Sequence, residues 1–167
     1  VVVTVMTNLG FRLAMDEAGI NVVETAVGDR YVLEALSAGG YSLGGEQSGH
    51  VIFADHATTG DGMLTAVALL DALKRAGRPL ADIAADTMTS LPQVLVNVRV
   101  AQRLPDVAAR LADEIAAAEL ELGATGRVLV RASGTEPLVR VMVEAPTHDL
   151  AQRVADSLAN AARDLVT

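Results

Sequence analysis

The 167-residue sequence contains no cysteine and no tryptophan, and only two phenylalanines and two tyrosines. The absence of cysteine excludes a disulfide framework, a thiolate nucleophile and a cysteine-based zinc site. It is also compatible with the cytoplasm, where we expect the protein to act. Because aromatic rings are scarce, the core is built from aliphatic side chains, and we expect any ligand site to be polar instead of a stacking platform.

Excess positive charge and long apolar runs are also missing. The formal net charge is −8, whereas binding to nucleic acid or to anionic lipid requires a basic surface. No apolar run approaches the roughly 20 residues of a membrane-spanning helix, and no signal peptide is recognisable. We therefore expect neither nucleic acid nor a membrane as a partner. The chain starts inside what reads as a buried strand, Val1 to Val5, without an initiator methionine, which predicts a fragment.

The first half alternates strand and helix signals. Apolar strands are predicted over residues 1–5, 21–26 and 51–54, and helices over residues 8–19, 31–38 and 61–77. Asn8 is suited to cap the first helix, and Gly19 is suited to end it. This alternation predicts an α/β domain over residues 1–88, with a mixed sheet covered by helices.

A polar stretch over residues 82–92 separates this domain from a second one, predicted over residues 89–167. Strands are expected over residues 93–100, 127–131 and 138–144, with helices over residues 105–122 and 149–166. This order predicts a small α+β domain of the β-α-β-β-α type. Val139, Val141 and Val143 share one face of their strand, and we expect the helices to cover that face.

One candidate binding loop is glycine-rich and runs from Gly44 to His50. It contains Glu46, Ser48 and His50, whose carboxylate, hydroxyl and imidazole are groups that can bind sugar hydroxyls. The alternative is a plain connection between strands in which His50 only caps a strand, and this alternative is favoured when the loop is considered alone.

A second candidate loop starts at Arg131 and continues as Ala-Ser-Gly-Thr-Glu-Pro to residue 137. The Arg131 guanidinium, the hydroxyls of Ser133 and Thr135 and the amides around Gly134 are suited to hold a phosphate. A simple hairpin connection is the alternative, because glycine and proline are common in turns. The loop is longer than a tight hairpin requires. Together, the two loops predict a phosphosugar ligand.

Four motifs, at residues 27–31, 45–50, 59–62 and 131–137, occur in an order that resembles the α-D-phosphohexomutase superfamily. The resemblance spans the whole sequence and corresponds to the third domain, truncated at its amino end, and the fourth domain. It implies that one set of residues contacts the sugar: Glu46, Ser48, and more weakly His50 and Arg30. It implies that a second set binds the phosphate that is not transferred: Arg131, Ser133, Gly134 and Thr135.

For the complete enzyme, the resemblance implies interconversion of glucosamine 6-phosphate and glucosamine 1-phosphate, on the route to UDP-N-acetylglucosamine and peptidoglycan. This chemistry uses a phosphoserine, a 1,6-bisphosphate intermediate and Mg²⁺. The phosphoserine and metal loops belong to the first two domains of the family and are absent from this sequence. We therefore expect no catalytic residue and no metal ligand here, an inactive chain, and the missing amino-terminal domains as its partner.

Asp61 lies in a Gly-Asp-Gly motif but is interpreted as a helix-capping residue, since one carboxylate cannot supply the several oxygen ligands of Mg²⁺. Two alternative functions remain open. The chain could be a stand-alone phosphosugar-binding module, or a fragment of a phosphomannomutase or phosphoglucomutase. No residue visibly recognises a 2-amino group, so the preference for glucosamine rests on the resemblance.

Overall fold

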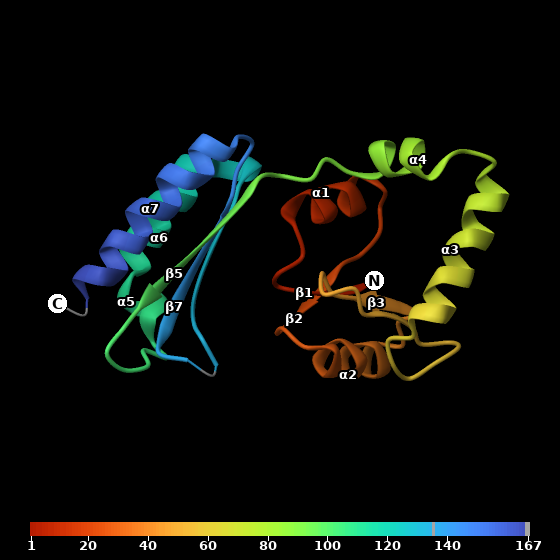
Figure 1. The fold of residues 1–167 in the computed structure, drawn as a ribbon, viewed down its shortest axis with the longest axis horizontal. Coiled ribbons are helices and arrows are strands. Elements are labelled where there is room, and N and C mark those ends of the chain that lie inside the picture. The colour runs from red at the N-terminus through yellow and green to blue at the C-terminus, as the bar shows by residue number, and fades with distance from the viewer. Residues whose placement is uncertain (135, 166–167) are drawn as a thin grey trace. The chain divides into compact units, whose positions relative to one another are not determined.

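The computed structural model describes residues 1–134 and 136–165, which form two compact units that divide between Ser90 and Leu91 (Figure 1). Each unit has its own sheet and its own helices. The α/β and α+β classes predicted from the sequence are confirmed. No helix among the described residues is long and apolar enough to cross a membrane.

The first unit is built on a mixed four-stranded sheet, sheet A. Its strands are β1 (Val2–Thr4), β2 (Val23–Thr25), β3 (Leu43–Gly45) and β4 (Val51–Phe53). They lie in the order β2-β1-β3-β4, and β1 is parallel to both of its neighbours while β4 is antiparallel to β3. Parallel pairing places the carboxyl ends of β1, β2 and β3 at one edge of the sheet.

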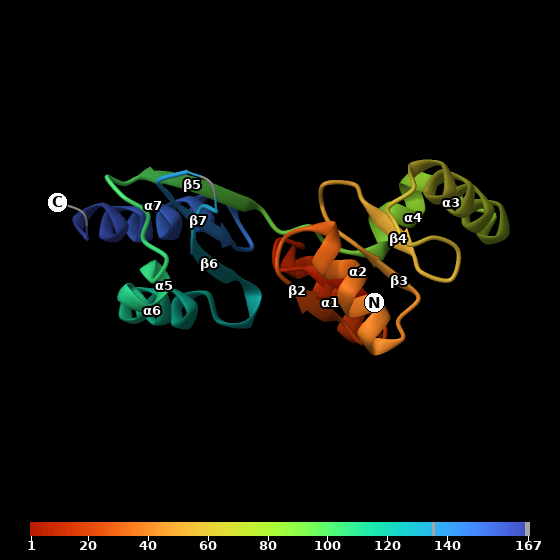
Figure 2. The same ribbon diagram turned by 90° about the horizontal axis from the view of Figure 1, so that it is seen from below.

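Four helices accompany sheet A: α1 (Leu9–Glu17), α2 (Asp29–Gly39), α3 (Gly62–Ala76) and α4 (Leu80–Thr87). As predicted, Asn8 caps α1, because its side chain accepts a hydrogen bond of 2.9 Å from the amide of Gly10. Helices α1 and α2 lie on opposite sides of the sheet (Figure 1, Figure 2). Helix α4 was not expected from the sequence.

One face of sheet A packs on α2. Val2 and Ile52 on this face form a buried cluster with Val32 and Leu36 of the helix. Gly44 lies between them in β3, and a Cβ atom there would stand 2.7 Å from Cγ1 of Val32. The glycine therefore permits the close approach of α2 to the sheet.

The second unit contains the antiparallel sheet B, with strands β5 (Gln93–Arg99), β6 (Arg127–Ala132) and β7 (Leu138–Glu144) in the order β5-β7-β6. Its helices are α5 (Val107–Arg110), α6 (Ala112–Leu122) and α7 (His148–Asp164). The single helix predicted over residues 105–122 is thus wrong. The helix is interrupted at Leu111, whose backbone has φ −108° and ψ 22° and whose side chain is held in the core at 1% exposure.

The core of the second unit lies on the valine face of β7, as predicted. Val139, Val141 and Val143 are fully buried with the apolar residues of α7, including Val154 and Leu158. This burial explains why a strand with alternating polar residues forms the centre of sheet B.

The opposite face of β7 carries charged side chains. At one end of the strand, Glu144 is fully buried and its Oε2 lies 2.7 Å from Nε of Arg127 on β6. The ion pair satisfies a carboxylate that would otherwise be costly to bury. The loop that joins β6 to β7 lies at the other end of β7, where the strand begins at Leu138.

Candidate functional site

The first candidate site is the loop that joins β3 to β4. The amide of Glu46 donates to the carbonyl of His50 at 3.0 Å, and the amide of Gly49 donates to the carbonyl of Glu46 at 3.0 Å. Gly49 has φ +95°, a conformation that side-chain-bearing residues rarely adopt. These bonds form a closed turn and hold its side chains close to one another.

The side chains of Glu46, Ser48 and His50 form a connected polar cluster. The hydroxyl of Ser48 lies 2.8 Å from Oε1 of Glu46 and 2.8 Å from Nδ1 of His50. Because a hydroxyl has one proton, both contacts are satisfied in the neutral ring when Ser48 donates to Glu46 and Nδ1–H of His50 donates to Ser48. This arrangement leaves Nε2 of His50 as an acceptor.

Glu46 and Ser48 line a cavity of about 480 Å³, a volume within the usual range of small-molecule sites. The other lining residues are Thr4, Met6, Val27, Gly28 and Gln47. Thr4 ends β1, and Val27 and Gly28 follow β2. The cavity therefore lies beyond the carboxyl ends of parallel strands, where α/β sheets commonly bind ligands.

Arg30 is not among the described residues that line this cavity. It lies in the first turn of α2, where its Nε donates to Oε1 of Glu34 at 2.8 Å. This hydrogen bond, together with the charge of Glu34, raises the pKa of Arg30 above its usual value. The structure thus brings Glu46, Ser48 and His50 together and places Arg30 in a separate ion pair, so its sugar contact remains a prediction.

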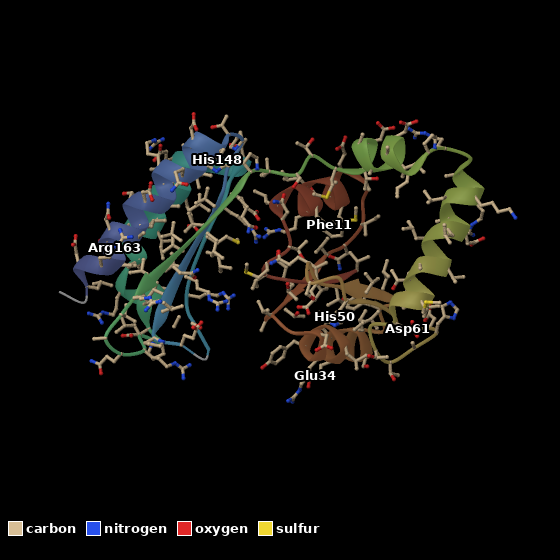
Figure 3. The ribbon with its side chains drawn as sticks, in the orientation of Figure 1. Phe11, Glu34, His50, Asp61, His148 and Arg163 are labelled. Carbon is tan, nitrogen blue, oxygen red and sulfur yellow. The ribbon has the colours of Figure 1, made fainter. Side chains whose placement is uncertain are left out.

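The loop before α3 packs against His50. A Cβ atom at Gly60 would lie 3.1 Å from Cβ of His50. The next residue, Asp61, accepts hydrogen bonds from the amides of Met63 at 2.8 Å and Leu64 at 3.0 Å. Figure 3 labels both Asp61 and His50. The helix-capping prediction for Asp61 is confirmed.

Magnesium has no suitable set of ligands in the described part of the chain. No group of three or more histidine, aspartate and glutamate side chains that could hold a metal occurs among residues 1–134 and 136–165. Asp61, which lies between two glycines, already accepts hydrogen bonds from two backbone amides of α3. The described residues therefore do not fit a magnesium site.

The second candidate site is the loop that joins β6 to β7. The amide of Ser133 donates to the carbonyl of Leu138 at 2.8 Å, and its Oγ accepts a hydrogen bond from the amide of Glu136 at 3.4 Å. Ser133 is 1% exposed, whereas Gly134 has open space where a Cβ would lie. Thr135, the remaining predicted phosphate ligand, lies outside the described residues.

Two arginines lie side by side next to this loop. Arg131 on β6 pairs directly with Arg140 on β7. Burial, together with the charge of Arg140, lowers the pKa of Arg131. Nε of Arg140 is buried and has no hydrogen-bond partner among the described residues, and its Nη2 lies 3.9 Å from a carboxylate oxygen of Glu136.

Arg140 was missed by the sequence analysis, although a signal existed. It stands three residues after Pro137, and the antiparallel register places it opposite Arg131. Directly opposed like charges destabilise a sheet. A bound dianion would offset this repulsion and could accept hydrogen bonds from both guanidinium groups.

The two units match two family models. Residues 1–91 match the phosphoglucomutase/phosphomannomutase alpha/beta/alpha domain III, and residues 95–161 match the phosphoglucomutase/phosphomannomutase C-terminal domain. The chain therefore belongs to the phosphoglucomutase/phosphomannomutase family.

Within this family, the chain is similar to curated phosphoglucosamine mutases. It is 63% identical to that of Thermobifida fusca and 63% identical to that of Frankia alni, in each case over 98% of this chain. The match covers only 36% of each relative's length and corresponds to its carboxyl-terminal part. Among solved structures, the N-acetylphosphoglucosamine mutase of Aspergillus fumigatus matches 99% of this chain and 39% of its own, with a TM-score of 0.81 and 24% identity. At this identity, the match shows the fold alone.

Proposed function

We propose that this chain is the sugar- and phosphate-binding part of an enzyme that interconverts glucosamine 6-phosphate and glucosamine 1-phosphate. The observation that carries this proposal is its 57–63% identity, over nearly the whole chain, to proteins named phosphoglucosamine mutase. The two polar loops support it, because one offers hydroxyl-binding groups and the other offers cationic phosphate-binding groups.

In the first unit, Glu46 would accept hydrogen bonds from sugar hydroxyls. Its carboxylate is 11% exposed and is already held by Ser48, so it loses little conformational entropy on binding. In the neutral tautomer with its proton on Nδ1, Nε2 of His50 would accept a hydrogen bond from a further hydroxyl. Arg30 would reach the ligand only after leaving Glu34.

In the second unit, Arg131 and Arg140 would hold the phosphate that is not transferred. The amides around Gly134 and the hydroxyls of Ser133 and Thr135 would complete the contacts. A fixed phosphate orients the sugar for reaction, and positioning with charge neutralisation is the main means of catalysing phosphoryl transfer.

The chemical step requires groups that this chain does not supply. We propose that the amino-terminal part of the complete enzyme provides a phosphoserine and the ligands of Mg²⁺, and that the reaction passes through a 1,6-bisphosphate. The chain by itself would bind without turnover. Because a phosphosugar is charged and crosses a bilayer poorly, its use supports a cytoplasmic location.

The test is isothermal titration of the chain with glucosamine 6-phosphate and with inorganic phosphate. We expect Arg131→Ala to weaken the binding of both ligands by about 1.5–3 kcal/mol, the range for a charge-assisted contact. The matched control is Arg110→Ala, an exposed arginine on α5, which should leave both affinities unchanged. Equal affinities for wild type and Arg131→Ala would contradict the phosphate assignment.

Turnover is tested by adding the amino-terminal part of the Thermobifida fusca relative to this chain. Glucosamine, glucose and mannose 6-phosphates are compared as substrates. We expect activity only in the mixture and fastest with glucosamine 6-phosphate. Faster turnover of glucose or mannose phosphate would assign the chain to a phosphoglucomutase or phosphomannomutase, and full activity without the added part would contradict the division of roles.

A further inference from the structure

The face of sheet B that points away from the valine core, which we call the outer face, receives polar side chains from all three strands. On β5, Val94 and Val98 are buried in the core, so Asn97 and Arg99 lie on the outer face. The antiparallel register places Asn97 directly opposite Arg140. Strand β5 therefore extends the row in which Arg140 faces the arginine of β6.

Arg99 lies beside the candidate phosphate loop. It pairs with Leu138, the first residue of β7, and the amide of the next residue, Val100, donates to the carbonyl of Pro137 at 3.0 Å. Arg99 is therefore diagonal to Arg140 across the two strands. Diagonal positions in an antiparallel sheet are roughly 7–8 Å apart, a spacing that long side chains can bridge.

The guanidinium of Arg99 is exposed, and none of the ion pairs within residues 1–134 and 136–165 includes it. Other arginines of the outer face differ in this respect. Arg127 is paired with Glu144 at the far end of the sheet, and Nη2 of Arg140 lies 3.9 Å from a carboxylate oxygen of Glu136. The charge of Arg140 is thus partly offset, whereas that of Arg99 is available to a ligand.

The charges around the loop that joins β6 to β7 match one phosphate monoester. Four arginines and two glutamates lie on the outer face and in this loop: Arg99, Arg127, Arg131, Arg140, Glu136 and Glu144. Together they leave two net positive charges, in a chain whose net charge is −8. A phosphate monoester carries about −1.5 to −2 charges at pH 7. Without Arg99, only one positive charge would remain to balance it.

We propose that Arg99 is a third phosphate-binding arginine, which supplies the positive charge that Glu136 offsets at Arg140. This inference rests on the proposed function, because it requires that the loop between β6 and β7 binds the phosphate of the substrate. The competing interpretation is a solvated surface charge, which is the usual role of an exposed arginine. That role predicts no effect of Arg99 on phosphate binding.

The test is isothermal titration with inorganic phosphate and with glucosamine 6-phosphate at an ionic strength of about 0.1 M, where charges more than about 10 Å apart are screened. Arg99→Gln should weaken the binding of both ligands about fivefold, because an exposed charged contact is weaker than a buried one. Arg99→Lys keeps the charge and should stay within about twofold of the wild type.

The matched control is Arg110→Gln, which makes the same change in net charge. Arg110 is exposed on α5, whose Val107 is buried in the core on the other face of sheet B. This variant should leave both affinities unchanged.

The charge balance is tested by a double-mutant cycle with Glu136→Gln. That substitution alone should tighten the binding of both ligands about threefold, since it removes a negative charge beside the bound phosphate. Combined with Arg99→Gln, it restores two net positive charges, and both affinities should return to within about twofold of the wild type. A surface charge without contact to the ligand predicts no such rescue.

The outcomes separate this inference from the proposed function. Unchanged affinities in Arg99→Gln, together with weaker binding in Arg131→Ala, would overturn the role of Arg99 and leave the phosphate site in place. Unchanged affinities in both variants would overturn the phosphate site and this inference with it. A double variant that binds no better than Arg99→Gln would also overturn the proposed role, because Arg99 would then not compensate for Glu136.

Discussion

Replacing Arg140 with methionine should stabilise the free protein and weaken its phosphate binding. Arg140 faces the like charge of Arg131 and has a buried Nε without a partner among the described residues. Directly opposed like charges cost roughly 0.2–1 kcal/mol, and an unsatisfied buried donor costs roughly 1–3 kcal/mol. Methionine removes both costs and keeps the aliphatic part of the side chain.

Because the Arg140 side chain is 33% exposed, solvent reduces both costs, and we expect a gain of about 1 kcal/mol in the free energy of unfolding. For a domain of this size, such a gain raises Tm by roughly 4–8 °C. Loss of one charge-assisted phosphate contact should reduce the affinity for inorganic phosphate roughly 10- to 150-fold.

The assay is differential scanning calorimetry of both proteins with and without phosphate, combined with isothermal titration. Arg127→Met is the matched control in the same sheet, because it leaves the carboxylate of Glu144 buried without this partner. That variant should lose about 3–5 kcal/mol of stability. A lower Tm for Arg140→Met together with unchanged phosphate affinity would refute the reasoning and make Arg140 a structural residue.

Three further outcomes are expected. Glu46→Gln should weaken glucosamine 6-phosphate binding in calorimetry by roughly 1–3 kcal/mol but leave inorganic phosphate binding intact; equal loss of both would contradict separate roles for the loops. Gly60→Ala should displace the ring of His50, visible as a shift of its imidazole proton resonances, at a stability cost of roughly 1–3 kcal/mol; unchanged resonances would contradict the packing. Asp61→Ala should lower the free energy of unfolding in urea by about 1 kcal/mol through loss of the α3 cap, without changing metal affinity; weaker Mg²⁺ binding in the variant would contradict the capping role.

Most of the fold could be predicted because most elements bury one apolar face. The helix predicted over residues 149–166 forms as α7, with Val154 and Leu158 buried, and the alternation of valines indicated β7. Strand β3 was read as part of a loop, since two of its three residues are glycine, and it forms because β1 and β4 pair with it on either side. Helix α4 gave no signal because none of its residues, all described by the structure, is buried.

The candidate loops could be identified from their residue types, but their internal contacts could not. The cluster of Glu46, Ser48 and His50 depends on a turn whose closure requires the positive φ of Gly49. Arg140 escaped notice because it resembles any polar residue on the outer face of a strand, and its closeness to Arg131 follows only from the register of the hairpin. The binding roles of these residues remain predictions.

The brevity of the strands in sheet A limits the association of the first unit with other molecules through its sheet edges. The edge strands β2 and β4 have three residues each, so they offer few unpaired backbone groups to another molecule. Long, flat edges are the templates from which intermolecular sheets and fibrils grow. The first unit can therefore leave apolar side chains such as Met63 and Leu70 exposed without presenting an edge long enough to seed aggregation.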